Sequence, residues 1–521
     1  MRWYCLRLGG STIRRRLAAA ALASSLLATA APALAQPAST VTIGAHVSLV
    51  TRWLDTSETE AEITPFMIYY ALHDALVKPM PGGLNTASLA ESWTMSKDGR
   101  TWDFVVRKGA RFHNGDPVTA EDVKFSFERY KGGGAPLFRQ RVKEVQVVDP
   151  GHVRFVLHEP WPDFMTFYGT SASGAAWVVP KKYFEKVGED GFRRAPVGAG
   201  PYKFVSFQPG IELVLEAFDG YWKKAPAVKR LVVRSIPDEA TRAAALKRNE
   251  VDIVYFINGP IAEDVRRTQG LTLTAMRTNG VFFLEFPDQW TAGSPWADRR
   301  VRLAASLSID RQAINEAESL GFSGITGSFI PRHQEFALAL DAHPYDPRRA
   351  KILLAEAGYP NGFELSEFTA YPPYNSMGEA IANYFNAVGI KTRVRTMERA
   401  AFLSAWRDKK LRGVFVGATG SAGNASTRIE AFATSKGLFS YGSIPEVETL
   451  FGKQIQEMDR KKREDMLHQI QRIMADRVVF AGIWENGFIR AFGPRMDEAG
   501  LNLIPSFPYA GPLEELRLKK Q

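Results

Sequence analysis

Eight histidines are the residues of this sequence most able to do acid–base or metal chemistry. No two of them stand four residues apart and no His-Glu-x-x-His motif occurs, so the spacing that holds zinc on one helix face is missing. The histidines therefore predict neither a zinc hydrolase nor a bound metal ion. They are His46, His73, His113, His152, His158, His333, His343 and His468.

Nucleophilic chemistry has no recognisable motif either. The sequence contains no Gly-x-Ser-x-Gly elbow, and no Ser-x-x-Lys accompanied by the other motifs of β-lactamases. Its only cysteine is Cys5. Acidic residues are frequent, but no pair stands in a recognisable glycosidase setting. The sequence does not predict an enzyme, and we expect no cofactor.

A glycine-rich loop, GATGSAGNAST at residues 417–427, follows a strand-like segment. It lacks the Gly-Lys-Ser/Thr ending that a phosphate-binding loop needs. Glycines at a strand end often serve backbone geometry alone. They also let the backbone approach a ligand closely where the strand end faces a crevice, and both interpretations remain open here.

The first 35 residues have the layout of a secretory signal. Residues 1–16 carry five arginines and no acid, residues 17–33 are small and apolar, and Ala33-Leu34-Ala35 matches a cleavage site. A membrane anchor is the alternative, but the apolar run is shorter than the roughly 20 residues of a span. Arg14-Arg15-Arg16 also leaves twin-arginine export open.

Cleavage after Ala35 changes the charge and the cysteine count. Of the 66 basic residues 61 remain, against 56 acidic ones, so the mature chain has a net charge of about +5 and no cysteine. Without a basic cluster, this charge does not predict nucleic-acid binding. A chain of 521 residues is too long for one hydrophobic core, so two or three domains are expected.

Alternating apolar patterns place these residues in an α/β framework. Strands are predicted at residues 40–46, 101–106, 153–157, 198–216 (a hairpin), 229–236, 251–256 and 281–286, and helices at 63–77, 238–249, 299–309 and 447–477. The order of strands and helices predicts two α/β lobes joined by segments near residues 275 and 480. Thr119 and Asp122 predict a capping box before a helix.

Five stretches resemble the family 5 extracellular solute-binding proteins, the peptide- and nickel-type receptors of bacterial ABC importers. The resemblance covers essentially the whole mature chain, with the motifs in the same order. The longest stretch is SLAESWTMSKDGRTWDFVVRKGARFHNGDPVTAEDVKFSFERY, and the others are PVGAGPYKFVSFQPG, residues 216–254, DRRVRLAASLSIDRQAI and YDPRRAKILLAEAGYPNGFEL.

The resemblance implies a periplasmic-binding-protein-like bilobed α/β fold, with two mixed-sheet lobes, a hinge and an extra small α+β subdomain. It implies a monomeric periplasmic receptor that encloses a small organic or peptide-like solute and delivers it to inner-membrane permease subunits. The expected parts are the signal peptide at residues 1–35, the extra subdomain at 81–194, lobe II at 276–484, and lobe I at 36–80, 195–275 and 485–521.

The sequence departs from peptide-binding relatives at two charged positions. Where those relatives carry an aspartate for the peptide amino terminus, this chain has no acid between Leu411 and Ile429. Where the dipeptide-binding relative carries an arginine for the carboxylate, Tyr371-Pro372-Pro373-Tyr374-Asn375 offers none. Burying unpaired peptide termini costs on the order of several kcal/mol. We therefore expect a less charged solute, or a peptide held by backbone and aromatic contacts.

Position along the predicted strands and the resemblance together give ten candidate cleft residues. Each has an alternative structural role, as core aromatic, exposed helix charge or turn cap. A metal-chelate or haem receptor of the same fold and a secreted hydrolase remain as alternative functions. The candidates are His46, Trp177, Tyr374, Arg399, Phe402, Trp406, Thr419, Ser421, Asn424 and Trp484.

Overall fold

The computed structural model describes residues 39–58, 64–170, 172–372, 374–420 and 423–520. The predicted signal peptide lies outside these residues, and Ser39–Gln521 forms one compact unit. No helix in the described part of the chain is both long and apolar enough to cross a membrane. The division into lobes and subdomain at the boundaries above stays a prediction.

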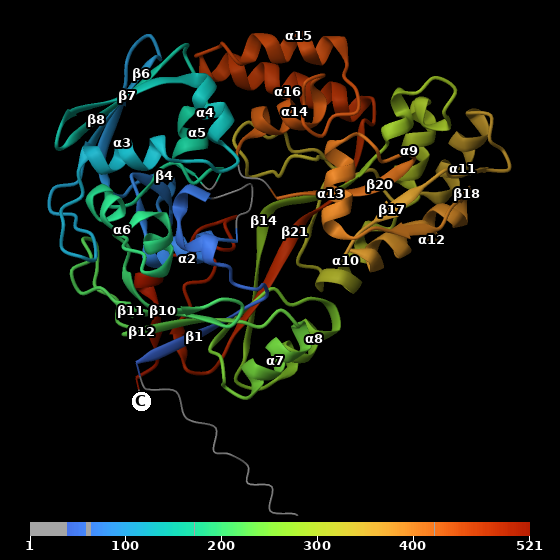
Figure 1. The fold of residues 1–521 in the computed structure, drawn as a ribbon. Helices are drawn as coiled ribbons and strands as arrows, with labels where there is room; N and C mark the ends of the chain where they lie inside the picture. Colours follow the sequence, from blue (N-terminus) through green and yellow to red (C-terminus); the bar gives the residue numbers. More distant parts are fainter. Residues whose placement is uncertain (1–38, 59–63, 171, 373, 421–422, 521) are drawn as a thin grey trace, which may run out of the picture. The chain divides into compact units, whose positions relative to one another are not determined.

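One large mixed sheet organises the molecule (Figure 1). Its strands fall into two groups, which we call the first half-sheet (β10 to β13) and the second half-sheet (β20, β17 and β19), with β21 and β14 between them. The order across the sheet is β10 (Tyr202–Gln208), β11 (Glu212–Ala217), β12 (Arg230–Ser235), β1 (Thr40–Ala45), β13 (Ile253–Tyr255), β21 (Phe480–Phe492), β14 (Thr272–Glu285), β20 (Val414–Thr419), β17 (Phe368–Ala370) and β19 (Val394–Thr396).

The half-sheets are joined by β14 and β21, which run antiparallel side by side (Figure 1). Residues 272–277 of β14 pair with 487–492 of β21, and pairing resumes at Val281 opposite Glu485. Residues 278–280 are therefore left out of the ladder. A break in register weakens a ladder locally and lets the strand bend, so this is the hinge candidate of the fold. The resulting two parts, carried by the two half-sheets, are called the first and second lobe below.

The first half-sheet has a core on each face. Val41, Ile43 and Ala45 of β1 belong to the larger core, which also includes α2 (Phe66–Leu72). Val254 of β13 faces the opposite way, into a smaller core with α7 (Glu239–Lys247) and α8 (Gly259–Arg267). Successive side chains of a strand point to opposite faces, so near-continuous apolar runs are what a sheet covered on both sides requires.

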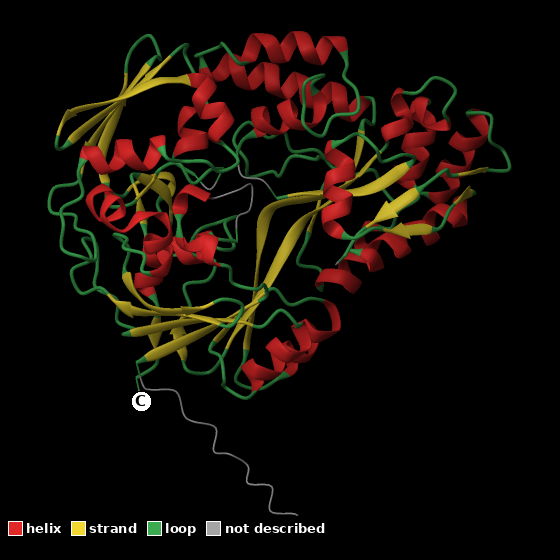
Figure 2. Cartoon of the chain, in the orientation of Figure 1, coloured by secondary structure: helices red, strands yellow, loops and turns green. Residues whose placement is uncertain are grey.

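The second half-sheet is also covered on both faces, as Figure 2 shows. Phe282 and Leu284 of β14 face one core, and Val281 and Phe283 face the other. Helices α9 (Arg299–Leu307), α10 (Arg311–Ser319), α11 (Pro347–Glu356) and α12 (Asn375–Val388) belong to the first core. Helices α13 (Arg399–Arg407), α14 (Ala425–Ala433), α15 (Pro445–Gln454) and α16 (Arg460–Asp476) belong to the second.

A separate antiparallel sheet of four strands carries the predicted extra subdomain (Figure 2). Its strands are β5 (Ala90–Met95), β6 (Thr101–Val106), β8 (His152–Leu157) and β7 (Val142–Asp149), and its helices are α3 (Ala120–Glu128), α4 (Ala135–Arg141), α5 (Phe164–Tyr168) and α6 (Lys181–Arg194). The capping box of Thr119 and Asp122 is confirmed. The subdomain shares one continuous core with the first lobe.

Short strand pairs complete the fold. They are β2 (Asp74–Ala75) with β9 (Trp177–Val178), β3 (Val77–Met80) with β4 (Gly83–Ala87), β16 (Phe363–Glu364) with β18 (Ile390–Lys391), β22 (Met496–Glu498) with β23 (Arg517–Leu518), and β15 (Gly324–Ile325) with β21.

Three predicted elements differ from the structure. The helix expected over residues 63–77 ends at Leu72, because His73 is extended and its Nε2 lies 3.0 Å from the carbonyl of Leu54. The single helix expected over 447–477 is wrong: α15 ends at Gln454, and Asp459 caps a new helix by accepting from the amide of Lys462. The strand expected at 281–286 begins earlier, at Thr272.

Candidate functional site

The carboxyl ends of the parallel strands in both half-sheets point toward the hinge. Strand β13 runs parallel to β1 and antiparallel to β21, so its end at Tyr255 approaches the break in the ladder. Strand β20 runs antiparallel to β14, and its last residue, Thr419, pairs with Val281 at the break. Strands β17 and β19 are parallel to β20. Ligands of open α/β sheets bind at such strand ends, so the hinge region is the candidate cleft.

His46 lies at the end of β1 against an aromatic wall from the C-terminal segment. Its Nε2 lies 3.1 Å from the Tyr509 hydroxyl, and the two rings stack with centroids 5.7 Å apart. Burial lowers the pKa of His46 to about 3, with the charges of Arg242 and Arg399 acting in the same direction. The imidazole is therefore neutral at physiological pH. Its Nδ1 is buried without a partner among the described residues.

The second lobe presents two tyrosines and an arginine at its own strand ends. Tyr371 and Tyr374 follow β17, and Arg399 begins α13 just after β19. The Tyr374 ring packs edge-on against Phe282 at 4.6 Å. Tyr371 stacks on Phe402 of α13 at 4.1 Å. This stacking fixes α13 against β17 and thereby fixes where Arg399 stands.

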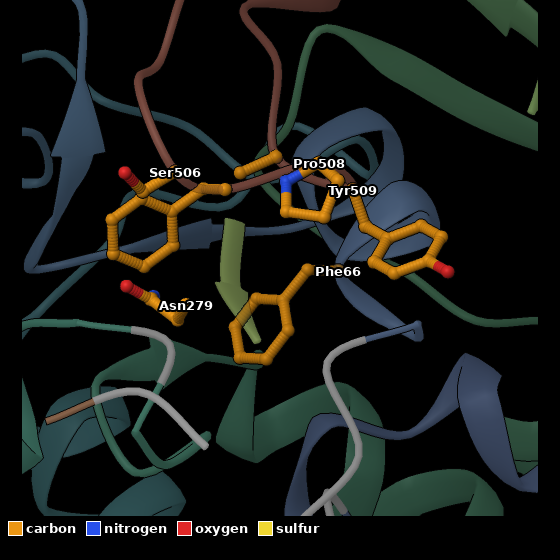
Figure 3. Close-up of a pocket in the computed structure, with 7 residues that line it drawn as sticks. Phe66, Asn279, Ser506, Pro508 and Tyr509 are labelled. Atoms are coloured by element: carbon orange, nitrogen blue, oxygen red, sulfur yellow. The ribbon is translucent and has the colours of Figure 1, made fainter. Parts of the chain in front are cut away.

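A small cavity of about 10 Å³, partly open to solvent, lies beside Tyr509. It is lined by Phe66 of α2, by Asn279 of the hinge and by the segment Ser506–Ala510, and Figure 3 shows Phe66 and Asn279 across from Ser506 and Pro508. Typical ligand pockets occupy about 300–1,000 Å³. A solute of ordinary size therefore requires more room between the lobes than this conformation leaves.

Four of the aromatic candidates are core residues in this conformation. Trp177, Phe402, Trp406 and Trp484 are each at most 3% exposed. Trp177 packs on the tyrosines of α2, and Trp484 on Phe282. Large aromatic side chains bury the most apolar area and dominate cores, which is why a sequence pattern does not separate a cleft aromatic from a core one. Their contact with a solute stays a prediction.

Asn424 caps a helix, in line with the alternative structural role given above, and it also makes a contact that the sequence did not suggest. Its side-chain oxygen caps α14 by accepting from the amide of Thr427, and its Nδ2 donates to Oδ1 of Asp163 at 2.6 Å. Asp163 precedes α5 of the extra subdomain and also pairs with Arg463 of α16. All three side chains are buried. The second lobe and the subdomain are thus joined by a charged contact, which we call the Asp163 contact.

The remaining candidates divide by position. His46, Tyr374 and Arg399 lie at strand ends beside the hinge, on both sides of it. Thr419 ends β20, and its side chain lies outside the description. Ser421 lies outside the described residues. Whether any of these residues binds a solute stays a prediction.

Sequence reasoning missed Tyr509 and Asn279. Tyr509 belongs to an irregular C-terminal segment with no periodic pattern, and Asn279 sits inside a long strand that the sequence suggested only from residue 281. Asn279 accepts from Arg428 through its carbonyl, and its Oδ1 lies 2.7 Å from Nε2 of His333. No local signal marks either residue, because both are defined by tertiary packing.

No cluster of three or more histidine, cysteine, aspartate or glutamate side chains suited to a metal ion occurs among the described residues. The polar groups beside the hinge include phenol hydroxyls, an imidazole, an amide and a guanidinium, together with the carboxylate of Glu485, which accepts from the amide of Arg332. Such groups orient an organic molecule by hydrogen bonds and charge.

Comparison with known proteins identifies relatives along most of the chain. The family described as bacterial extracellular solute-binding proteins, family 5 middle region, matches residues 86–440. The dipeptide-binding protein of Escherichia coli strain K12 is 28% identical over 427 residues, covering 75% of this chain and 78% of the relative. Heme-binding protein A of Haemophilus influenzae is 26% identical over 443 residues, covering 78% and 80%.

A solved structure shares the fold. NikA from Brucella suis, in complex with Fe(III)-EDTA, superposes with a TM-score of 0.81 over 92% of this chain and all of its own, at 19% identity. The long β14–β21 crossing and the two half-sheets therefore belong to a known two-lobe architecture. At 19% identity, this match supports a shared fold and nothing about function.

Proposed function

The chain belongs to the family 5 bacterial extracellular solute-binding proteins, and from this premise we propose that it captures a small organic or peptide-like solute between its lobes and delivers it to an ABC importer. The chain is a binding protein and not an enzyme. Delivery to inner-membrane permease subunits, a periplasmic location after cleavage at Ala35, and a monomeric state belong to the same proposal.

One observation carries the proposal: polar side chains from both lobes stand at strand ends that face a single hinge, or pack directly against a residue that does. His46 and Tyr509 come from the first lobe, and Tyr374 and Arg399 from the second. A solute that contacts both sets binds the closed conformation more tightly than the open one. Differential affinity of this kind is what drives hinge closure.

A free dipeptide is not the expected cargo. Residues 411–429 offer no acid for a peptide amino group. Position 371, which precedes the Pro-Pro-Tyr-Asn run, is a buried tyrosine stacked on Phe402 and not an arginine. A dipeptide bound here would have to leave both termini unpaired or find other partners. A longer peptide-like molecule or another organic solute avoids that cost.

A haem or metal-chelate cargo is the second candidate. One relative is named for haem and one structural neighbour holds Fe(III)-EDTA. In this chain such a cargo would be held through its organic part, by the aromatic and cationic groups at the hinge.

Mass spectrometry of the protein purified from its own periplasm under native conditions tests the proposal. We expect a bound small molecule, released unchanged on denaturation. Adding that molecule back at 100 times its Kd should stabilise the protein by about 2.7 kcal/mol. Chemical conversion of the molecule by the protein would contradict the proposal, and so would failure of both this sample and a broad solute screen to show any binding.

A further inference from the structure

The carboxylate of the Asp163 contact is used entirely across the interface between the extra subdomain and the second lobe. Asp163 stands at the N-cap position of α5, yet its side chain accepts no hydrogen bond from that helix. Its oxygens accept instead from Nδ2 of Asn424 and from the guanidinium of Arg463. No other hydrogen bond or ion pair joins this carboxylate to a described residue. An aspartate at an N-cap usually caps its own helix, so this side chain is committed to the second lobe.

The second lobe orients Arg463 toward this carboxylate. The Nε of Arg463 donates to Oε1 of Gln454 at 3.0 Å, and its guanidinium lies over the ring of Phe336, 5.1 Å from the centroid. Both of these neighbours belong to the second lobe itself. Arg463 is 3% exposed and Asp163 is 7% exposed, so the ion pair is shielded from water. Because its own lobe already fixes the guanidinium, little side-chain freedom is lost when the contact forms.

The interface extends beyond the ion pair, and Figure 1 shows α5 beside α14 and α16. The turn between β5 and β6 of the subdomain packs against the loop between α15 and α16, where a Cβ added at Gly99 would lie 2.9 Å from Cε of Met458. Helix α14, which Asn424 caps, also carries Arg428, whose guanidinium donates to the carbonyl of Asn279 in the hinge. One helix of the second lobe is therefore tied both to the subdomain and to the hinge.

The conformation that makes this contact is too tight for cargo. The cavity beside Tyr509 has a volume of about 10 Å³, against about 300–1,000 Å³ for typical ligand pockets. Cargo at the hinge must hold the second lobe farther from the first lobe. The subdomain shares a continuous core with the first lobe, so it stays behind when the second lobe moves. Hydrogen bonds do not persist once donor and acceptor are more than about 3.5 Å apart, so this movement breaks the Asp163 contact.

We propose that the Asp163 contact is an autoinhibitory latch, which holds the lobes in a closed conformation that excludes cargo and has to break before cargo binds. The inference goes beyond the proposed function and rests on it only where it names cargo. Latched and cargo-bound conformations exclude each other, so the apparent Kd equals the intrinsic Kd divided by the unlatched fraction. Separation of the lobes hydrates both charges of the ion pair, so neither charge is left buried and unpaired.

The first test measures the distance between the lobes without cargo. Residues 36–521 contain no cysteine, so Val148→Cys in the subdomain and Leu438→Cys in the second lobe, at side chains 53% and 57% exposed, accept spin labels specifically. The protein is freed of bound molecules by denaturation and refolding. Double electron–electron resonance should then show one short distance in the parent, with a longer distance in about one tenth of the molecules or fewer.

Two variants should release the latch to different degrees. Asp163→Asn leaves the Arg463 cation unpaired in the latched form and should shift most molecules to the longer distance. Asn424→Ser keeps an oxygen that caps α14 but lacks the Nδ2 donor, so it should give a smaller shift in the same direction. The control is Asp103→Asn, which removes the same charge from an ion pair with Arg154 inside the subdomain. It should leave the distance unchanged.

The second test asks whether the latch opposes cargo. Trialanine, glutathione, haemin and Fe(III)-EDTA are titrated into the unlabelled proteins by calorimetry, together with any molecule recovered from the natively purified protein. A probe that binds the parent should bind Asp163→Asn about tenfold or more tightly, because the unlatched fraction of the variant is larger. Asp103→Asn should bind it as the parent does.

Three results would overturn the inference. They are a parent that is mostly open without cargo, an Asp163→Asn variant that keeps the parent's distance, and an Asp163→Asn variant that binds the probes no more tightly than the parent. If circular dichroism shows that Asp163→Asn does not fold, the parent and Asn424→Ser decide. If no probe or recovered molecule binds, the proposed function fails, whereas the distances still decide whether the latch exists.

Discussion

Glu285, the last residue of β14, is a buried acid with an unsatisfied oxygen. It is 3% exposed, and its Oε2 has no hydrogen-bond partner among the described residues. Burial raises the pKa of Glu285 well above its usual value, against the opposing charge of Lys409 and the nearby Trp406. The Trp406 indole nitrogen stays outside hydrogen-bonding geometry. Tyr441, whose own pKa is raised by burial and by Glu285, is a further neighbour.

Substituting Glu285 should change how stability depends on pH. The unfolded chain releases this proton above about pH 4.5, whereas the folded chain keeps it, so folding loses stability as the pH rises above that value. Glu285→Gln keeps the neutral shape and removes this loss. We expect the melting temperature of Glu285→Gln to exceed that of the parent at pH 7 and 8 and to equal it at pH 4.

The control for this prediction is Glu379→Gln, an exposed glutamate of α12. It should leave the pH profile of the melting temperature unchanged. Parallel profiles for Glu285→Gln and the parent between pH 4 and 8 would show that Glu285 is not held neutral in the folded protein.

For single residues, the sequence predicted where a side chain lies in the fold better than it predicted which groups surround that side chain. His46 and Arg399 stand where strand ends and the family resemblance suggested, beside the hinge. Trp406 was an equally plausible cleft residue from its residue type, yet its side chain is buried in a core with Phe415, Phe432 and Phe439. Sequence spacing places an aromatic residue on a helix face but does not say whether that face meets a cleft or another helix.

The Asp163 contact belongs to the scale of elements, because it joins α5 of the subdomain to α14 and α16 of the second lobe. Asp163→Asn keeps an oxygen for the Asn424 amide but leaves the buried Arg463 cation without its carboxylate. Removing one partner of a buried pair typically costs about 3–5 kcal/mol. We expect a loss of this size in the free energy of unfolding, measured by chemical denaturation.

A second substitution separates charge from packing at this contact. Asp163→Asn combined with Arg463→Met removes the stranded cation and should recover part of the lost stability. Asp341→Asn, at a side chain that is 99% exposed, is the control and should have little effect. Equal losses in the single and double variants would argue against charge as the cause.

The break in the β14–β21 ladder predicts a local difference in dynamics. Amides in a peptide covering residues 277–281 should exchange with deuterium faster than those in the paired segments 272–276 and 282–285. Binding of cargo should slow this exchange, because closure restricts the hinge. Uniform protection along β14, unchanged by cargo, would place the hinge elsewhere.

Helices and strands were predictable where a single sequence pattern, either apolar alternation or helical spacing, dominated a segment. The hairpin β10–β11 and the unit β12–α7–β13 follow from alternation and capping signals in the sequence. The boundary between α15 and α16 was missed because Glu457 and Asp459 look like ordinary exposed helix residues. Only the structure shows that the side chain of Asp459 caps a new helix.

For the whole molecule, buried histidines predict sensitivity to acid. Burial is the largest cause of a lowered pKa in five of them, with values of about 3 or 4 against an ordinary 6.5. A histidine with a lowered folded pKa contributes stability above its unfolded pKa and loses it as the pH falls. The five are His46, His73, His113, His333 and His343.

Stability should therefore fall between pH 7 and pH 5. Unfolding at pH 5 takes up nearly one proton per buried histidine. Four acids have pKa values raised by burial, so unfolding releases their protons and their effect on stability opposes that of the histidines. These four acids are fewer than the five histidines. We expect a lower midpoint of urea denaturation at pH 5 than at pH 7. An equal or higher midpoint at pH 5 would contradict the prediction. The four acids are Asp122, Asp252, Glu285 and Glu430.

The position of β21 also governs when the chain can fold. This strand comes from residues 480–492, yet it lies between β13 and β14, which the ribosome completes about 200 residues earlier. Until Phe480 and its successors emerge, β13 and β14 each keep an open edge, and open edges invite aggregation. The sheet can therefore close only after the last tenth of the chain has been synthesised. A truncated product that ends before residue 480 should remain bound to chaperones.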